Sequence, residues 1–248
     1  METEKKNYDD LKELALLEDM ALFGVADLRD IKHTFHPSIE NVAKDLPFGV
    51  SVGFNLSGAI LENIIDGPTL IYKHHYKAVN YKLDQAALKF VKFIEGKGYR
   101  ALPVSASQTI DWENQLGHLS HKLVGKFAGL GFIGRSALLV SPEYGARVRY
   151  VTILTDLPLI TDKATEISCG ECQRCINACP AKAITLEGYD KGKCLVKLKE
   201  FSKERGIGVY ICGVCVKVCG GSSQFKMNSN PKSQINSNNQ NSNFLVIR

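Results

Sequence analysis

The chain has 248 residues, a formal net charge of +5, 44% hydrophobic residues and 23% charged residues, which is ordinary for a globular soluble protein of one or two domains. No block of Lys and Arg marks an arm that binds nucleic acid, although a mildly basic surface suits an acidic electron donor or a tRNA. The N-terminus is charged, and no stretch approaches the roughly 20 apolar residues of a membrane span, so we expect a cytoplasmic protein without a membrane partner.

Hydrophobic periodicity predicts an irregular alternation of helices and strands. The clearest helix covers residues 83–95, where six apolar residues form one stripe and two glycines follow. In chain order, the pattern predicts a helix over 9–20 that ends before Gly24, a strand over 48–54, a short helix over 57–65, the helix over 83–95, a strand over 99–104, a helix over 116–128, and strands over 137–140 and 148–154.

All eight cysteines lie between positions 169 and 219. They read Cys169-x2-Cys172-x2-Cys175-x3-Cys179-Pro180, then Cys194, then Cys212-x2-Cys215-x3-Cys219. The first run has the spacing with which bacterial ferredoxins hold iron–sulfur clusters, and eight thiolates are enough for two [4Fe–4S] clusters. The cysteines therefore predict a protein that transfers single electrons.

The spacing also predicts which cysteines bind which cluster. Three cysteines separated by two-residue gaps reach three corners of one cluster, and the fourth of the run ligates the other cluster. We therefore expect Cys194 to complete the second cluster, because Gly208 and Val209 stand where its third loop cysteine is missing. The first cluster is then bound by Cys169, Cys172, Cys175 and Cys219, and the second by Cys179, Cys194, Cys212 and Cys215.

Disulfides and zinc are the alternative interpretations of these cysteines. Disulfides require an oxidising compartment, and the chain has no secretory signal stretch. Zinc sites favour two separated C-x2-C pairs, whereas this chain has C-x2-C-x2-C-x3-C-P. Both alternatives fit less well than iron–sulfur clusters.

Composition predicts three segments. Residues 1–162 have the irregular helix–strand pattern of an α/β or α+β domain, and residues 163–221 read as a small ferredoxin-like domain that binds two [4Fe–4S] clusters. Residues 222–248 are rich in Asn and Ser without apolar periodicity, which predicts disorder.

A glycine run matches the dinucleotide fingerprint G-x-G-x-x-G at Gly129, Gly131 and Gly134. That fingerprint requires a strand before it and a helix after it, whereas here a helical stretch precedes the run and a strand follows it. Nicotinamide binding is therefore disfavoured. The glycines fit a loop that approaches another bulky cofactor, or a tight turn from helix to strand.

Three further side chains are candidates for chemistry. Tyr76 could donate a proton or a hydrogen bond to a cofactor, although a buried tyrosine with a satisfied hydroxyl is an ordinary alternative. His118 and His121 are spaced i, i+3 within the helix predicted over 116–128, so that both would lie on nearly one face and could bind a metal. Surface or core histidines are the commoner outcome of such spacing.

With these residues described, the chain to about position 220 resembles the epoxyqueuosine reductase family, iron–sulfur proteins that bind cobalamin and share features with reductive dehalogenases. The resemblance rests on His118-x2-His121-Lys122, on 128–135 (AGLGFIGR), on 154–159 (LTDLPL) and on the complete cysteine set. It implies a cobalamin domain before the two-cluster domain, with single electrons passing through the clusters to cobalt while a protein acid supplies a proton. It also implies a corrinoid pocket lined by Lys122, Gly129, Gly131, Gly134 and Arg135.

Two departures from the family shape the functional hypothesis. Ser105 stands where epoxyqueuosine reductases carry the aspartate that is their proposed proton donor, and the chain stops soon after the cysteines, which suggests a short paralogue. We therefore expect an enzyme that passes electrons through two clusters to a corrinoid to reduce a substrate that the sequence does not identify. The alternatives are a ferredoxin-type electron carrier without corrinoid or catalysis, and an epoxyqueuosine reductase in tRNA modification. The expected partners are an electron donor such as a ferredoxin or flavodoxin, and a small-molecule or tRNA substrate.

Overall fold

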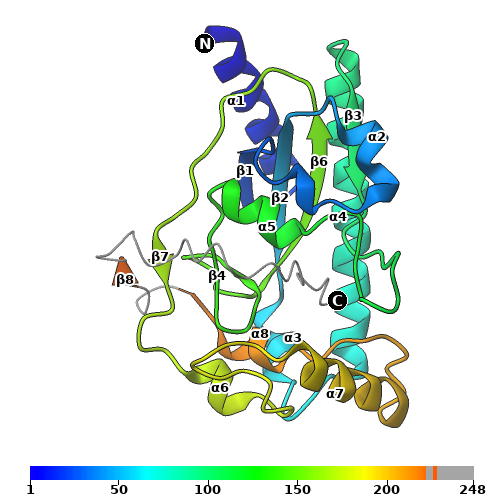
Figure 1. Cartoon of the computed structure of the whole chain (residues 1–248), viewed down its shortest axis with the longest axis vertical. Coiled ribbons are helices and arrows are strands. Elements are labelled where there is room, and N and C mark those ends of the chain that lie inside the picture. The colour runs from blue at the N-terminus through cyan, green and yellow to red at the C-terminus, as the bar shows by residue number, and fades with distance from the viewer. Residues whose placement is uncertain (222–225, 228–248) are drawn as a thin grey trace.

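The computed structural model describes residues 1–221 and 226–227 (Figure 1). The predicted disordered tail, residues 222–248, lies outside these described residues except for Lys226–Met227, which form the short strand β8. The predicted mixture of helices and strands is confirmed.

The core of the fold is a four-stranded antiparallel sheet. Its strand order is β1 (Leu22–Asp27), β2 (Phe48–Asn55), β6 (Val148–Thr155) and β3 (Ala101–Val104). The two central strands, β2 and β6, are buried along most of their length, as expected for a sheet that is covered on both faces.

Helices cover the two faces of this sheet. Successive side chains of β6 point to opposite faces, so the strand contributes to the packing on both. Val151 and Ile153 pack in one hydrophobic cluster with Phe90, which belongs to the long helix α4 (Leu70–Gly96). Tyr150 and Leu154 pack in a second cluster with residues of α5 (His121–Phe127). Helix α1 (Glu2–Leu17) joins α4 on its face (Figure 1).

The cysteine segment crosses the lower end of the molecule in Figure 1, below the sheet. Its elements are β7 (Ile167–Ser168), α6 (Arg174–Ala178), α7 (Lys191–Glu204), α8 (Val214–Val218) and β8. Its helices α6 and α8 have five residues each, α7 has 14, and the two-residue strand β7 pairs with β8. The remaining elements are η1 (Lys32–Thr34), η2 (Pro37–Ile39), α2 (Glu40–Ala43), α3 (Gly58–Glu62), β4 (Phe132–Ile133) and β5 (Leu139–Val140).

Helix α4 has 27 residues, about twice the predicted length. Its first half buries Tyr72, Tyr76 and Asn80, so the buried face is aromatic and polar and lacks the aliphatic stripe that marks residues 83–95. The helix begins after Thr69, whose hydroxyl oxygen accepts a hydrogen bond from the backbone nitrogen of Tyr72 at 3.3 Å.

Strand β1 was not predicted, because Gly24 was interpreted as the end of a helix. Gly24 lies inside the strand, where a Cβ atom would stand 2.1 Å from the carbonyl oxygen of Ala128. A glycine in a strand that marks such a close backbone approach does not end the element.

Helix α5 begins at His121, five residues later than predicted, because Ser120 caps it. The Ser120 hydroxyl accepts a hydrogen bond from the backbone nitrogen of Leu123 at 3.3 Å. His118 therefore precedes the helix, so the predicted shared helix face of His118 and His121 is wrong. In the described part of the chain, no helix is long and apolar enough to cross a bilayer.

Candidate functional site

The two cysteine runs are built in the same way around two short helices. Cys175 lies in α6 and Cys179 follows its last residue; likewise, Cys215 lies in α8 and Cys219 follows its last residue. Both trailing cysteines leave helical geometry, with ψ angles of 113° at Cys179 and 85° at Cys219. The chain therefore turns away after each helix and carries the last thiol of each run away from the thiols before it.

The thiols gather into two groups of four. One cavity is lined by Cys169, Cys172, Cys175 and Cys219, which we call the first cysteine group. A larger cavity is lined by Cys179, Cys194, Cys212 and Cys215, which we call the second cysteine group. All eight carry free thiols. The grouping has the membership that the spacing predicts for two four-thiolate clusters.

The pKa shifts of Cys175 and Cys212 are consistent with the same two groups, because each is raised by cysteines of its own group. Burial, followed by the charges of Cys169, Cys219 and Cys172, raises the pKa of Cys175 to about 11. Burial also raises the pKa of Cys212 to about 12, with Cys194 and Cys179 as its charged cysteine neighbours. Buried thiols of this kind deprotonate when they coordinate metal.

Within the described residues, no three His, Cys, Asp or Glu side chains converge closely enough to bind a single metal ion. The ligands of a [4Fe–4S] cluster bind four different iron corners, so they stand farther apart than the ligands of one ion.

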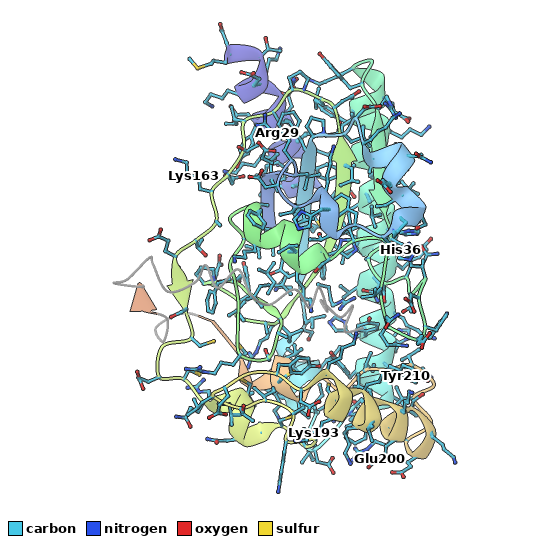
Figure 2. All side chains as sticks on the ribbon, in the orientation of Figure 1. Arg29, His36, Lys163, Lys193, Glu200 and Tyr210 are labelled. Atoms are coloured by element: carbon cyan, nitrogen blue, oxygen red, sulfur yellow. The ribbon has the colours of Figure 1, made fainter. Side chains whose placement is uncertain are left out.

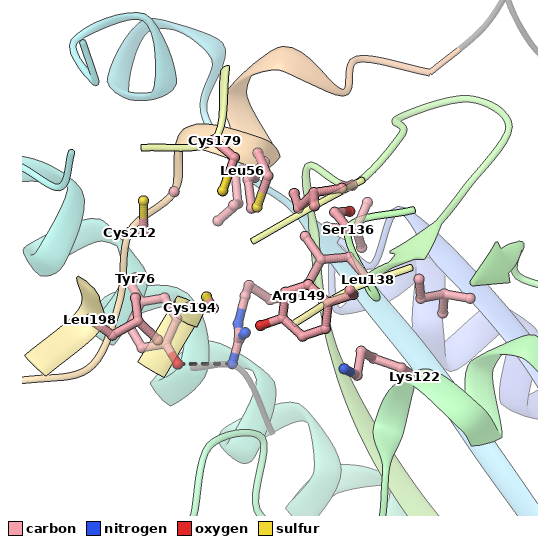
Figure 3. A pocket seen from close by; sticks show the side chains of 18 of the residues that line it. Leu56, Tyr76, Lys122, Ser136, Leu138, Arg149, Cys179, Cys194, Leu198 and Cys212 are labelled. Atoms are coloured by element: carbon pink, nitrogen blue, oxygen red, sulfur yellow. Dashed lines mark hydrogen bonds between the residues drawn. The ribbon is translucent and has the colours of Figure 1, made fainter. Parts of the chain in front are cut away.

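The larger cavity lies between the lower end of the sheet and the cysteine segment, and it encloses about 1180 Å³ including its open mouth. Most of its wall is apolar, with Leu138 from the glycine-run hairpin and Leu198 from α7 among the lining residues (Figure 3). Cys194 and Leu198 stand one helical turn apart on the inner face of α7, whereas Lys193 is exposed at the lower edge of the molecule (Figure 2). Residues of the sheet-containing segment and of the cysteine segment therefore form the wall of this cavity together.

Tyr76 and Arg149 form the polar centre of this cavity. The Arg149 guanidinium donates a hydrogen bond to the Tyr76 hydroxyl at 3.2 Å and lies 4.5 Å from the centre of its ring (Figure 3). The Tyr76 hydroxyl also shares a hydrogen bond of 2.9 Å with the hydroxyl of Ser107. Arg149 is fixed in turn by Asn80, whose side-chain oxygen accepts a hydrogen bond at 3.1 Å.

Lys122 and His121, at the start of α5, border the same cavity. The Lys122 ammonium donates to the carbonyl oxygen of Ala137 at 2.8 Å, and burial, followed by the Arg149 charge, lowers the pKa of Lys122 to about 8. His121 donates from Nε2 to the Ser105 carbonyl at 2.9 Å, because a carbonyl can only accept. Burial lowers the pKa of His121 to about 4, so the ring is neutral at pH 7 and not a cation.

The glycines of the run pack against backbone and sulfur and do not line the larger cavity. A Cβ atom at Gly131 would stand 2.1 Å from the Val140 carbonyl oxygen, and one at Gly129 would stand 2.9 Å from the Lys163 carbonyl oxygen. Gly134 borders the smaller cavity, where a Cβ atom would stand 3.3 Å from the sulfur of Cys169. Of the five residues that the resemblance implies for a corrinoid pocket, Lys122 alone is among those that line the larger cavity.

Arg135 holds the loop of the first cysteine group. Its guanidinium donates to the carbonyl oxygens of Gly170 at 2.6 Å and Cys172 at 3.2 Å. Arg147 makes a similar connection, since it donates to the Lys217 carbonyl at 3.1 Å in α8. These arginines join the glycine-run hairpin and β6 region to the cysteine segment.

His118 lies away from the larger cavity. Its Nδ1 atom is 3.0 Å from the Ser38 hydroxyl, which is also 2.9 Å from Nδ1 of His36. Ser105, which stands where the family pattern has an aspartate, borders a small cavity together with His118 and His121. The structure therefore brings Tyr76, Lys122 and His121 together on the larger cavity. His118 and Ser105 do not line that cavity, although the Ser105 carbonyl accepts the hydrogen bond from His121.

Sequence reasoning missed Arg149 and Tyr150, which line the larger cavity from the first residues of β6. A signal was present: an arginine is the one charged residue in this buried strand of eight residues. Neighbouring residues of a strand point to opposite faces of the sheet, so one cavity on one face would not meet both side chains. Both reach this cavity since it lies at the end of the sheet.

No family model matches the chain. The epoxyqueuosine reductase of Bacillus cereus is 33% identical over 112 residues, which cover 42% of this chain and 30% of that protein. The chain thus aligns with less than a third of the length of that curated relative.

Two solved structures share the fold. One is a reductive dehalogenase described with a mechanism for B12-dependent dehalogenation; it has a TM-score of 0.68 at 19% identity, over 87% of this chain and 32% of that one. The other is an epoxyqueuosine reductase with an epoxyqueuosine-modified tRNA-Tyr stem loop; it has a TM-score of 0.56 at 20% identity, over 86% of this chain and 65% of that one. The chain is similar in sequence to epoxyqueuosine reductases over part of its length, and similar in fold to both epoxyqueuosine reductases and reductive dehalogenases.

Proposed function

We propose that the chain is a reductase in which single electrons pass through two [4Fe–4S] clusters to a corrinoid in the larger cavity. The observation that carries the proposal is that the second cysteine group forms part of the wall of that cavity. A cluster on these thiols would border the bound cofactor directly. The first cysteine group lies in the adjoining smaller cavity, and Ser136 lines both.

The residues of the larger cavity fit a corrinoid. The wall offers apolar surface and also a buried Tyr150 hydroxyl that has no hydrogen-bond partner within the described protein. An orphaned buried hydroxyl suits a ligand that carries polar groups. Lys122 and Tyr150 are the polar residues that we expect to hold the cofactor.

Bound corrinoid supplies the cobalt redox chemistry that protein side chains lack. The chain's own contribution is a proton, and none of the described residues that line the cavity is Asp or Glu. Tyr76 is the proton donor that we propose. Arg149 donates to its oxygen, and a cation in that position stabilises the negative charge that remains when the proton leaves.

The comparisons favour epoxyqueuosine in tRNA as the substrate over the unidentified substrate that the sequence favours. The curated relatives are epoxyqueuosine reductases, and one related structure holds an epoxyqueuosine-modified stem loop. Ser105, which replaces the family's aspartate, does not line the larger cavity, whereas Tyr76 does. A proton from Tyr76 would therefore take the place of the proton that the aspartate is proposed to supply.

Filling the cavity tests the corrinoid site. We expect anaerobically reconstituted protein to bind about one cobalamin, and Leu138→Trp to lose this binding while it retains about eight irons. Leu88→Trp is the matched control, because Leu88 is 50% exposed on α4. Cobalt and iron analysis after gel filtration measures both. Clusters without cobalt uptake in the unmodified protein would support the electron-carrier alternative instead.

Removing the Tyr76 hydroxyl tests the proton donor. We expect Tyr76→Phe to bind cobalamin normally but to reduce epoxyqueuosine in a tRNA-Tyr stem loop about 10²–10⁴-fold more slowly, the usual contribution of general acid catalysis. Single-turnover assays measure the rate. Tyr81→Phe, on the exposed side of α4, should react at the unmodified rate. If the unmodified protein binds cobalamin but leaves the stem loop unchanged, the substrate assignment is wrong and the corrinoid site remains.

A further inference from the structure

The first cysteine group does not line the larger cavity and lies instead beside two openings of its own. Cys169 lines both the smaller cavity and a further cavity of about 790 Å³ including its mouth, which we call the open cavity. The side chains that flank Cys172 in the sequence, Glu171 and Gln173, are exposed. The loop that carries Cys169 and Cys172 is therefore at the surface, where a partner protein can reach it.

Positive side chains line both openings. Lys126 and Arg135 line the open cavity, and Arg135 and Arg174 line the smaller cavity. None of the described residues that line either cavity is Asp or Glu. Glu166 and Glu171, on the same stretch of chain, are exposed and belong to neither wall. The walls beside the first cysteine group are therefore positively charged.

Carboxylates of the described residues do not neutralise the charges of Lys126 and Arg135. The Lys126 ammonium lies 5.8 Å from the centre of the Phe127 ring, and the Arg135 guanidinium donates to backbone carbonyl oxygens of the cysteine loop. By contrast, Lys197 on α7, which lines the larger cavity, forms an ion pair with Glu200. The positive charge beside the first cysteine group therefore remains available to a partner from outside.

We propose that these walls bind an acidic protein that donates single electrons, and that electrons enter the chain at the first cysteine group. The inference rests on the clusters of the proposed function and names the partner that supplies their electrons. In each transfer the donor is oxidised by one electron, and the cluster on the first cysteine group is reduced by one. Charge complementarity speeds the encounter of two proteins, and electron-transfer complexes bury little surface. A charged surface beside the ligands therefore suits a transient donor complex.

Reversing the charge of Lys126 and Arg174 tests the inference on the full-length, anaerobically reconstituted protein. Arg135 is left unchanged because it holds the cysteine loop. The probe is reduced flavodoxin, an acidic flavin protein, and stopped-flow spectroscopy measures the second-order rate constant of cluster reduction. We expect Lys126→Glu combined with Arg174→Glu to lower this constant about tenfold or more at low salt. Calorimetry should show weaker binding of oxidised flavodoxin to the same variant.

Lys6→Glu combined with Lys12→Glu is the matched control. It changes the net charge by the same amount, on exposed positions of α1 at the opposite end of the molecule from the cysteine segment (Figure 1). This variant should be reduced at close to the unmodified rate. Iron analysis and EPR of the reduced clusters show whether each variant keeps both clusters. The inference is overturned if the variant of Lys126 and Arg174 keeps its iron and its unmodified rate, or if the control slows equally.

A second measurement covers the case in which the variant of Lys126 and Arg174 loses iron. In the unmodified protein, the rate constant with flavodoxin should fall steeply between about 50 mM and about 500 mM salt, because salt screens the attraction between the two surfaces. Clusters that are reduced at a rate independent of salt would overturn this inference alone. A preparation without any iron–sulfur cluster would overturn the proposed function and the inference with it.

Discussion

Replacing Cys179 by serine is expected to remove the second cluster and to leave the first intact. The iron content should fall from about eight to about four per chain. Cys179 follows directly after the run that contains Cys172 and Cys175, so its sequence position alone suggests the first cluster. In the structure, its thiol instead lines the larger cavity with Cys194, Cys212 and Cys215.

The EPR spectrum of the remaining cluster identifies which one is lost. We expect reduced Cys179→Ser to match Cys194→Ser, because both retain the first cluster. Cys219→Ser should match Cys172→Ser, although Cys219 lies four residues after Cys215 in the chain. If the spectrum of Cys179→Ser matched that of Cys172→Ser, the two cysteine groups would be assigned wrongly.

Gly131→Ala is expected to destabilise the protein by about 4 kcal/mol or more, among the largest effects of single substitutions. A Cβ atom at this position would stand 2.1 Å from the Val140 carbonyl oxygen, and backbone on both sides of the contact belongs to the β4–β5 hairpin. Neither side can move without breaking the hairpin. Urea unfolding under anaerobic conditions measures the free energy of unfolding.

Gly96→Ala is the matched control for this substitution. Gly96 ends α4, and a Cβ atom there meets no atom within 4 Å, so alanine should be neutral or stabilising by up to about 1 kcal/mol. If Gly131→Ala folded normally and lost only cobalamin affinity, the run would serve the corrinoid directly, as the resemblance implies, and packing would be its lesser role.

The cysteine pattern carried most of what sequence could predict about the site. Ligand spacing is a local property, so the membership of the two groups, including Cys194, follows from counting residues. Strands β2, β3 and β6 were also predicted, because their apolar residues are continuous. The function of the glycines was harder to predict, since a close backbone contact and a ligand contact select the same residue.

The larger cavity could not be predicted because residues distant in sequence form it. Tyr76 and Arg149 are separated by 73 positions and meet only because α4 crosses the end of β6. The first half of α4 also lacked an aliphatic stripe, so its helical geometry was not apparent. Tertiary contacts of this kind leave no periodic signal in one sequence.

The connections between the two segments run in both directions. Lys217 of α8 donates to the Glu62 carbonyl at 3.1 Å, and Arg147 at the edge of β6 donates to the Lys217 carbonyl at 3.1 Å. Residues before and after position 162 both line the larger cavity, so neither part of the chain forms the complete cavity alone. In the proposed function, the cysteine segment on another scaffold would keep its two cysteine groups but would lose the cavity in which their electrons reach the cofactor.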